Sequence, residues 1–192
     1  MKKRIVEKLV TNVNDILVYH KMYHYMLHLL DQQDQLHNRR IIILCIGSDR
    51  YIGDALGPLV GSYLEENTEC TVYGSLDKPV HAGNLIEVIE NIKEQYHQPI
   101  IIAIDACLGK NDEIGNIEIW EGGLEAGIAV GNKLPYIGTI SIIGVVNASG
   151  YMGYLDLQST PLSIVMRLSK CIGRVVGDTI GFVRINGSAF NQ

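Results

Sequence analysis

The chain has 192 residues, of which 47% are hydrophobic and 19% are charged, and its net charge is −5. This composition predicts a globular domain of ordinary size and excludes a disordered chain. The acidic balance, with only two short basic runs at residues 2–4 and 39–40, argues against a nucleic-acid partner.

The sequence also argues against a membrane or secreted protein. Its start lacks the apolar core of a signal peptide, and no stretch reaches the roughly 18 apolar residues that a membrane span needs. We therefore expect a cytoplasmic protein without a membrane partner.

The first 30 residues are predicted to be helical. Apolar residues recur there at intervals of three and four, which is typical of an amphipathic helix; they are Ile5, Leu9, Val13, Ile16 and Leu17. His20, His24 and His28 share one face, and we interpret them as a partly exposed polar stripe because no acidic residue completes a metal site. The polar segment 31–40 then separates an N-terminal helical extension, residues 1–40, from the rest.

Strand-length apolar runs alternate with helix-period segments across residues 41–192. The runs cover residues 41–46, 70–73, 100–104, 117–121 and 140–146, and the helical segments include residues 59–64, 85–92 and 160–176. This alternation is typical of βαβ units whose sheet is covered on both faces. We predict one compact α/β unit, a three-layer α/β/α arrangement with a mostly parallel central sheet.

Two aspartates follow predicted strands. Asp54 lies in IGSDRYIGDALGP, residues 46–58, and Asp105 lies in IIIAIDACLG. Ligands of open parallel sheets bind beyond the carboxyl ends of the strands. Taken alone, Asp54 is expected to cap the next helix, and Asp105 to bind loop amides. Taken together, two neighbouring acids can share a proton and supply one acid and one base, so we predict Asp54 and Asp105 as a catalytic pair.

Other residues at this edge are predicted to bind substrate or to stabilise an oxyanion. They are Gly47, Ser48, Asp49, His81, Gly131, Asn132 and Lys133, the last three within a glycine-rich loop at residues 127–135. The phosphate-loop, dinucleotide, serine-hydrolase and zinc motifs are missing, so we expect no metal and no cofactor. Cys107 follows Asp105 closely, but no histidine lies nearby in the sequence to act as its base.

Three blocks carry a family resemblance. IGSDRYIGDALGP, AIDACLG and GIAVGNKLPYIGTISIIGVVNASG, in this order, resemble the sporulation protein YyaC family over nearly the whole chain. More distantly they resemble the germination protease that degrades small acid-soluble spore proteins, and the hydrogenase maturation endopeptidases, which are similar in fold. The resemblance implies that Asp54 and Asp105 match the two proposed catalytic acids of the germination protease, which needs no metal, and that residues 131–133 match its glycine-rich site loop.

The chain also departs from these families. Ile52 and Gly53 stand where the germination protease has Thr-Pro, and no histidine follows His97, which leaves the nickel-recognition trio of the hydrogenase peptidases incomplete.

Two functions follow from these observations. The first is a peptidase of sporulation or germination that cleaves peptides or spore proteins in the sporulating cell or spore. The second is a catalytically inactive sporulation factor that binds a peptide or protein on the same scaffold, a hypothesis favoured by the departure at residues 52–53. Both leave a homo-oligomer open.

Overall fold

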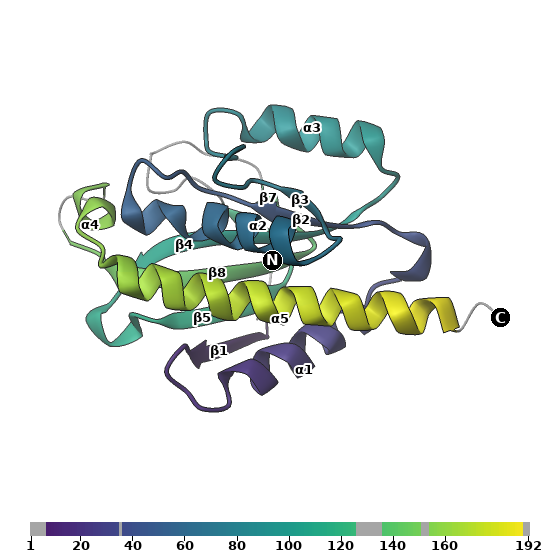
Figure 1. The fold of residues 1–192 in the computed structure, drawn as a ribbon, viewed down its shortest axis with the longest axis horizontal. Coiled ribbons are helices and arrows are strands. Elements are labelled where there is room, and N and C mark those ends of the chain that lie inside the picture. Colours follow the sequence, from purple (N-terminus) through teal and green to yellow (C-terminus); the bar gives the residue numbers. More distant parts are fainter. Residues whose placement is uncertain (1–6, 35, 126–135, 151–153, 190–192) are drawn as a thin grey trace, which may run out of the picture.

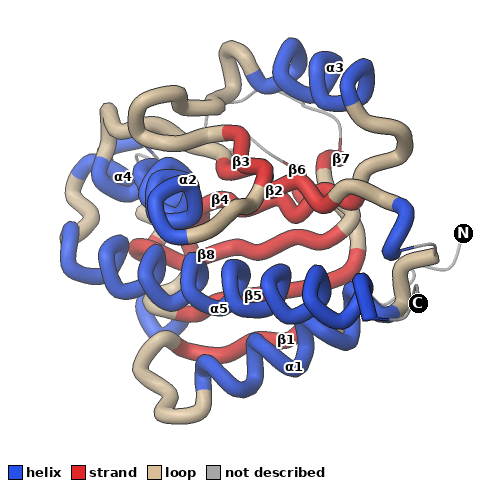
Figure 2. The backbone as a smooth tube through the Cα atoms, turned by 45° about the vertical axis from the view of Figure 1, so that its right-hand side comes forward, coloured by secondary structure: helices blue, strands red, loops and turns tan. Residues whose placement is uncertain are grey.

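The computed structural model describes residues 7–34, 36–125, 136–150 and 154–189. Its centre is a six-stranded sheet in the order β1-β5-β8-β4-β2-β3 (Figures 1 and 2). The strands are β1 (Lys8–Asn12), β2 (Ile41–Cys45), β3 (Thr71–Tyr73), β4 (Ile100–Gly109), β5 (Asn116–Glu121) and β8 (Ile140–Ala148). A separate two-stranded ribbon pairs β6 (Leu124–Glu125) with β7 (Tyr136–Ile137).

Helices cover both faces of the sheet, unequally. The helices are α1 (Val18–Asp31), α2 (Leu56–Asn67), α3 (Leu85–Gln95), α4 (Tyr154–Gln158) and α5 (Leu162–Ala189), and short 3-10 turns are η1 (Leu36–Asn38), η2 (Ile52–Ala55) and η3 (Asn111–Glu113). Helices α1, α2 and α5 lie on one face of the sheet and α3 lies on the other (Figure 2). The core on the first face contains buried side chains of α1, α2 and α5, and the core on the second contains those of α3. The predicted α/β fold with helices on both faces of the sheet is therefore confirmed. No helix in the described part of the chain is long and apolar enough to cross a membrane.

The central strands form where the sequence is continuously apolar. All five residues of β2 and the first five of β4 are buried, because α2 and α3 cover opposite faces of this part of the sheet. Strand β8 runs parallel to β4, and β2 runs parallel to both β4 and β3. Strands β1 and β5 run antiparallel to their neighbours and make the sheet mixed at one edge.

The prediction of helix over the first 30 residues is wrong for residues 8–12. These residues form the edge strand β1, in which Leu9 lies opposite Ile119 and Thr11 opposite Ile117. The spacing of four residues between Leu9 and Val13 fits the period of a helix. In the structure this segment is a strand, so its side chains alternate between the two faces of the sheet. The predicted helix begins only at Val18.

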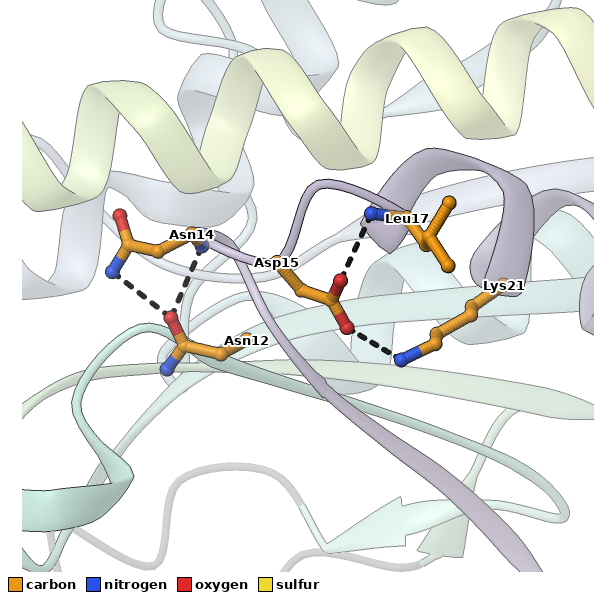
Figure 3. A network of polar contacts seen from close by, with 5 residues as sticks. All are labelled: Asn12, Asn14, Asp15, Leu17 and Lys21. Carbon is orange, nitrogen blue, oxygen red and sulfur yellow. Dashed lines mark hydrogen bonds and ion pairs between the residues drawn. The ribbon is translucent and has the colours of Figure 1, made fainter.

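A polar network fastens β1 to its surroundings (Figure 3). The side-chain oxygen of Asn12 accepts hydrogen bonds from the backbone and side-chain N–H groups of Asn14, and its side-chain nitrogen donates to Asn116 and to the carbonyl of Ile114. Asp15 accepts from the backbone N–H of Leu17 and pairs with Lys21 at the start of α1 (Figure 3). The turn between β1 and α1 is thereby held against β5.

Helix α1 then packs against α5. Met22, Met26 and Leu30 are fully buried in the core that α1 shares with α5. At the surface, the Tyr19 hydroxyl donates to Asp178, 2.7 Å away, and the guanidinium of Arg174 lies over the Tyr19 ring. The beginning and the end of the described chain are therefore in direct contact.

Glycines allow α2 to lie directly on the ends of β2 and β3. A Cβ atom on Gly57 would lie 2.1 Å from the carbonyl oxygen of Ile46, and one on Gly61 would lie 1.9 Å from the carbonyl oxygen of Gly74. These atoms belong to backbone, which cannot rotate away as a side chain could. The spacing of Gly57 and Gly61 places both on one face of α2. The helix is thereby held close to the carboxyl end of β2.

We expect Gly57→Ala to lower the free energy of unfolding by about 3 kcal/mol, because the added methyl group forces α2 away from the backbone of Ile46. Gly181→Ala is the matched control, since nothing lies within 4 Å of a Cβ atom at this position of α5. It is expected to raise the free energy of unfolding by about 0.5–1 kcal/mol through helix propensity. Urea denaturation of the two variants measures both values, and equal effects of the two substitutions would contradict the close approach of α2.

Candidate functional site

The predicted site lies where the order of the parallel strands reverses. From β2 the chain passes through α2 to β3 on one side, and then through α3 to β4 on the other side. Helix α2, which follows β2, and helix α3, which leads into β4, lie on opposite faces of the sheet. Ligands of open α/β sheets bind at such a switch point. The segment after β2 carries Asp54, and β4 carries Asp105.

Asp105 lies where β4 loses one of its neighbours. Pairing between β2 and β4 ends at Cys45 and Ile104, whereas pairing between β4 and β8 continues to Gly109. The burial of β4 changes at the same point, from five buried residues to five partly exposed ones, of which Asp105 is the first. The sheet therefore opens on the β2 side of Asp105, but its carboxyl group remains buried enough for its pKa to rise.

Asp54 lies in η2, which packs against β4 and continues directly into α2. The expectation that Asp54 caps the helix is wrong. The residue at the N-cap position of α2 is Ala55, and no side chain caps this end. Instead, the backbone of Asp54 is anchored: its carbonyl accepts from the N–H of Ser48 at 3.1 Å, and its N–H donates to the carbonyl of Tyr51 at 3.0 Å. Its half-buried carboxyl group is therefore not consumed by capping the helix.

The charge of Asp54 acts on the protonation of Asp105. Burial raises the pKa of Asp105 to about 8, the backbone N–H of Ala106 works in the opposite direction, and the charge of Asp54 raises the pKa further. Burial also raises the pKa of Asp54, but the backbone of Ser48 and the charge of His81 lower it. Since its pKa lies near 8, Asp105 is mostly protonated at neutral pH, whereas Asp54 has two neighbours that favour its ionised form.

His81 reaches this site through an extension of the sheet. Ile46 pairs with Val80 in a parallel bridge, and the N–H of Gly47 donates to the carbonyl of Val80 at 2.8 Å. The ring of His81 is oriented by its own turn, in which its Nδ1 accepts the N–H of Gly83 at 3.1 Å. In the neutral form of the ring, this hydrogen bond leaves the proton on Nε2.

The other predicted site residues are placed less uniformly. Gly47 is buried with φ +138°, and a Cβ atom there would lie 2.0 Å from the carbonyl oxygen of Asp54, so only glycine fits. Its N–H is bound to Val80 and is not free to stabilise an oxyanion. Ser48 is buried and its Oγ accepts the N–H of Arg50, whereas Asp49 is exposed. Gly131, Asn132 and Lys133 lie outside the described residues.

Three neighbours of the site were not predicted from the sequence. The backbone N–H of Ala106 donates to Asp105 Oδ1 at 2.7 Å, and no sequence pattern reports a backbone partner of this kind. Thr160 and Leu157 contact η2 at Gly53, where an added Cβ atom would lie 2.7 Å from Thr160 Oγ1. Thr160 is the first residue of a helical segment that the sequence predicts at residues 160–176, but no periodicity connects it to Gly53.

Cys107 is unsuited to act as a nucleophile. Burial raises the pKa of its thiol to about 12, and the charges of Glu118, Asp105 and Glu113 act in the same direction. The thiol is therefore protonated at neutral pH, and a protonated thiol is a poor nucleophile. Among the described residues, no cluster of three or more His, Cys, Asp or Glu side chains could hold a metal ion. His20, His24 and His28 are exposed on α1, as the polar-stripe interpretation expects.

The raised pKa of Asp105 makes stability depend on pH. Between the ordinary value of 3.8 and about 8, the folded chain holds a proton that the unfolded chain has released, so stability falls as pH rises through this window. We expect Asp105→Asn to remove this slope and to be more stable than the native chain at pH 8 by roughly 1–3 kcal/mol. Denaturation midpoints from pH 4 to 9 test this, with the exposed Asp112→Asn as control. Parallel curves for all three proteins would contradict the assignment.

The fold is similar to that of a solved peptidase. The structure superposes on the [NiFe] hydrogenase maturation protease HycI from Thermococcus kodakarensis KOD1 with a TM-score of 0.54, covering 82% of this chain and 99% of that one. The two sequences are 17% identical, so the likeness is one of fold. It confirms the predicted resemblance to the fold of the hydrogenase maturation peptidases.

Sequence comparison identifies closer relatives. The chain is 43% identical over 134 residues to the uncharacterized protein YyaC of Bacillus subtilis strain 168; the alignment covers 69% of this chain and 65% of the length of that relative. Residues 10–175 match the family model described as "Protein of unknown function (DUF1256)". The chain therefore belongs to the DUF1256 family, to which the predicted resemblance to YyaC pointed.

Proposed function

We propose that this protein is a peptidase in which Asp54 and Asp105 act as a general base and a general acid without a metal ion. The observation that carries the proposal is that η2, which contains Asp54, packs against β4, which contains Asp105, at the switch point of the sheet. The charge of Asp54, which raises the pKa of Asp105, supports it. The peptidase-like fold supports it. The resemblance to sporulation and germination proteins suggests that the substrate is a peptide or protein of the sporulating cell or spore.

The environments of the acids assign the roles. Asp105 Oδ1 accepts the N–H of Ala106, so the proton of the neutral acid resides on Oδ2 and can be donated to a substrate carbonyl oxygen. Asp54 has the backbone of Ser48 and the charge of His81 to stabilise its ionised form, so it accepts a proton from water.

The reaction then balances without a cofactor. Water attacks the carbonyl carbon, Asp54 takes one proton of that water, and Asp105 gives its proton to the carbonyl oxygen. When the tetrahedral intermediate collapses, the carbon–nitrogen bond breaks, the nitrogen takes the proton held by Asp54, and Asp105 recovers its own proton from the hydroxyl group. The products are a carboxylic acid and an amine, and both acids return to their starting states.

General acid–base help of this kind accelerates a reaction by about 10²–10⁴-fold, so further stabilisation of the developing charge is needed. The N–H of Gly47 is already bound to Val80. His81, with its proton on Nε2, is the described residue that we propose for this role, together with the predicted Gly131 and Asn132.

The first test identifies new chain termini. Lysate of sporulating cells is incubated with the native chain, with Asp54→Asn and with Asp105→Asn, and new termini are counted by mass spectrometry. We expect cleavage by the native chain and a loss of at least about 100-fold in each variant, because either substitution removes one proton-transfer group. Asp112→Asn, an exposed acid in η3, is expected to cleave as the native chain does. Equal cleavage by all four proteins would exclude this mechanism, and no cleavage by any would favour the inactive binding protein.

The second test is the pH dependence of cleavage. Activity needs an ionised Asp54 and a protonated Asp105, so kcat/KM should follow a bell-shaped curve. Its alkaline limb should lie near the pKa of Asp105, about 8, and its acidic limb above the ordinary aspartate value of 3.8, because burial raises the pKa of Asp54. An optimum that keeps rising beyond pH 9 would rule out Asp105 as the acid.

A further inference from the structure

Along one edge of β4, only part of the backbone forms hydrogen bonds with a neighbouring strand. On the β2 side, the N–H of Ile100 donates to the carbonyl of Arg40, and the carbonyl of Ile104 accepts the N–H of Ile46. On the β8 side, the carbonyls of Ile101 and Gly109 accept hydrogen bonds from Thr139 and Ser149. Even-numbered residues of β4 therefore direct their backbone groups toward β2, and odd-numbered ones toward β8.

Among the residues that the structure describes, no strand pairs with the β2 side of β4 after residue 105. Ala106 and Leu108 continue the even-numbered series, but β2 pairs with β4 only as far as Ile104. The N–H of Ala106 is satisfied by the carboxyl group of Asp105. The carbonyl of Ala106 and both backbone groups of Leu108 have no hydrogen-bond partner on this side among the residues that the structure describes.

This edge is fixed in place rather than loose. Residues 106–109 remain paired with β8 on their other side, and the side chains of Ala106 and Leu108 pack against the core that α5 covers. An unpaired edge held rigidly within a sheet is a template for an added strand. Its four residues span about 13 Å, which matches about four residues of extended chain.

We propose that residues 106–109 of β4 bind the substrate as an added β-strand, through its main chain, and so select extended polypeptide segments. This inference rests on the proposed function for its purpose. Asp105 immediately precedes the edge and η2 packs against β4, so an added chain meets Asp105 and Asp54 at one end. Recognition through main-chain groups favours unfolded or extended segments over helical ones and imposes little demand on side chains.

Binding can be measured without cleavage. The probe is a pool of random octapeptides, blocked at both ends, added at millimolar concentration to isotope-labelled Asp54→Asn. We expect the amide resonances of Ala106, Leu108 and Gly109 to shift, and the exchange of the Leu108 amide hydrogen to slow by about tenfold, because a new hydrogen bond protects it. The control pool has the same composition but N-methylated backbone amides, which cannot form the ladder, and it should cause neither effect.

Strand β3 is the internal control, since Thr71–Tyr73 is also an edge strand and, in the described part of the chain, pairs with β2 alone. Shifts at β3 in place of β4, an equal response to the methylated pool, or no shift at β4 would each overturn the proposal. The outcomes remain separable from those of the cleavage test. If the Leu108 amide is protected but the native chain cleaves nothing, the peptidase is refuted and the strand site is kept. If the native chain cleaves but the Leu108 amide is not protected, the peptidase is kept and the strand site is refuted.

Discussion

The contact between the backbone of α2 and the end of β2 determines how the site is built. The N–H of Ile46 donates to β4, so its carbonyl oxygen also faces β4 and would accept the next hydrogen bond if the parallel ladder continued. Gly57 of α2 lies against this oxygen instead. Strand β2 therefore ends, η2 is held beside β4, and β4 continues with β8 alone. This one contact therefore accounts for three features of the site. They are the position of Asp54 beside β4, the partial exposure of Asp105, and the unpaired edge of β4 beyond Asp105.

Different local environments explain how the sheet edge accommodates two acids. A carboxylate surrounded by apolar strands is destabilised unless it is protonated or hydrogen bonded. Asp105 meets the condition in both ways, through its raised pKa and through the N–H of Ala106. Asp54 meets it through the backbone of Ser48 and the charge of His81. The local environments of two identical side chains thus differ: burial and a neighbouring charge favour the protonated form of Asp105, whereas Ser48 and His81 favour the ionised form of Asp54.

Sequence patterns predicted the elements whose period is long and regular. The apolar runs at residues 41–46 and 100–104 became β2 and β4, and the helical period after Thr160 became α5. The prediction for residues 8–12 was wrong because a short segment fits both periods, and only pairing with β5 decides between them. The cap role of Asp54 was wrong because a 3-10 turn precedes α2, a feature without a sequence period.

Only part of the site could be predicted from the sequence, because sequence patterns locate strand ends but not backbone partners. That Asp54 and Asp105 share one edge follows from strand alternation, but the backbone partners do not. Gly47 was expected to offer its N–H to a substrate, and tertiary pairing with Val80 uses that group instead. The free edge of β4 depends on where two strands stop relative to each other, which no single-strand pattern contains.

The pairing of β1 with β5 has a consequence for biosynthesis. Lys8 lies opposite Trp120, and Tyr19 contacts Asp178, so the first strand and helix must wait for segments made more than a hundred residues later. Contacts this distant in the chain slow folding, and a β-strand without its partner is open to association with other chains. While the ribosome is still translating, β1 therefore has no native partner, and the sheet is completed at this edge only after β5 has emerged from the exit tunnel.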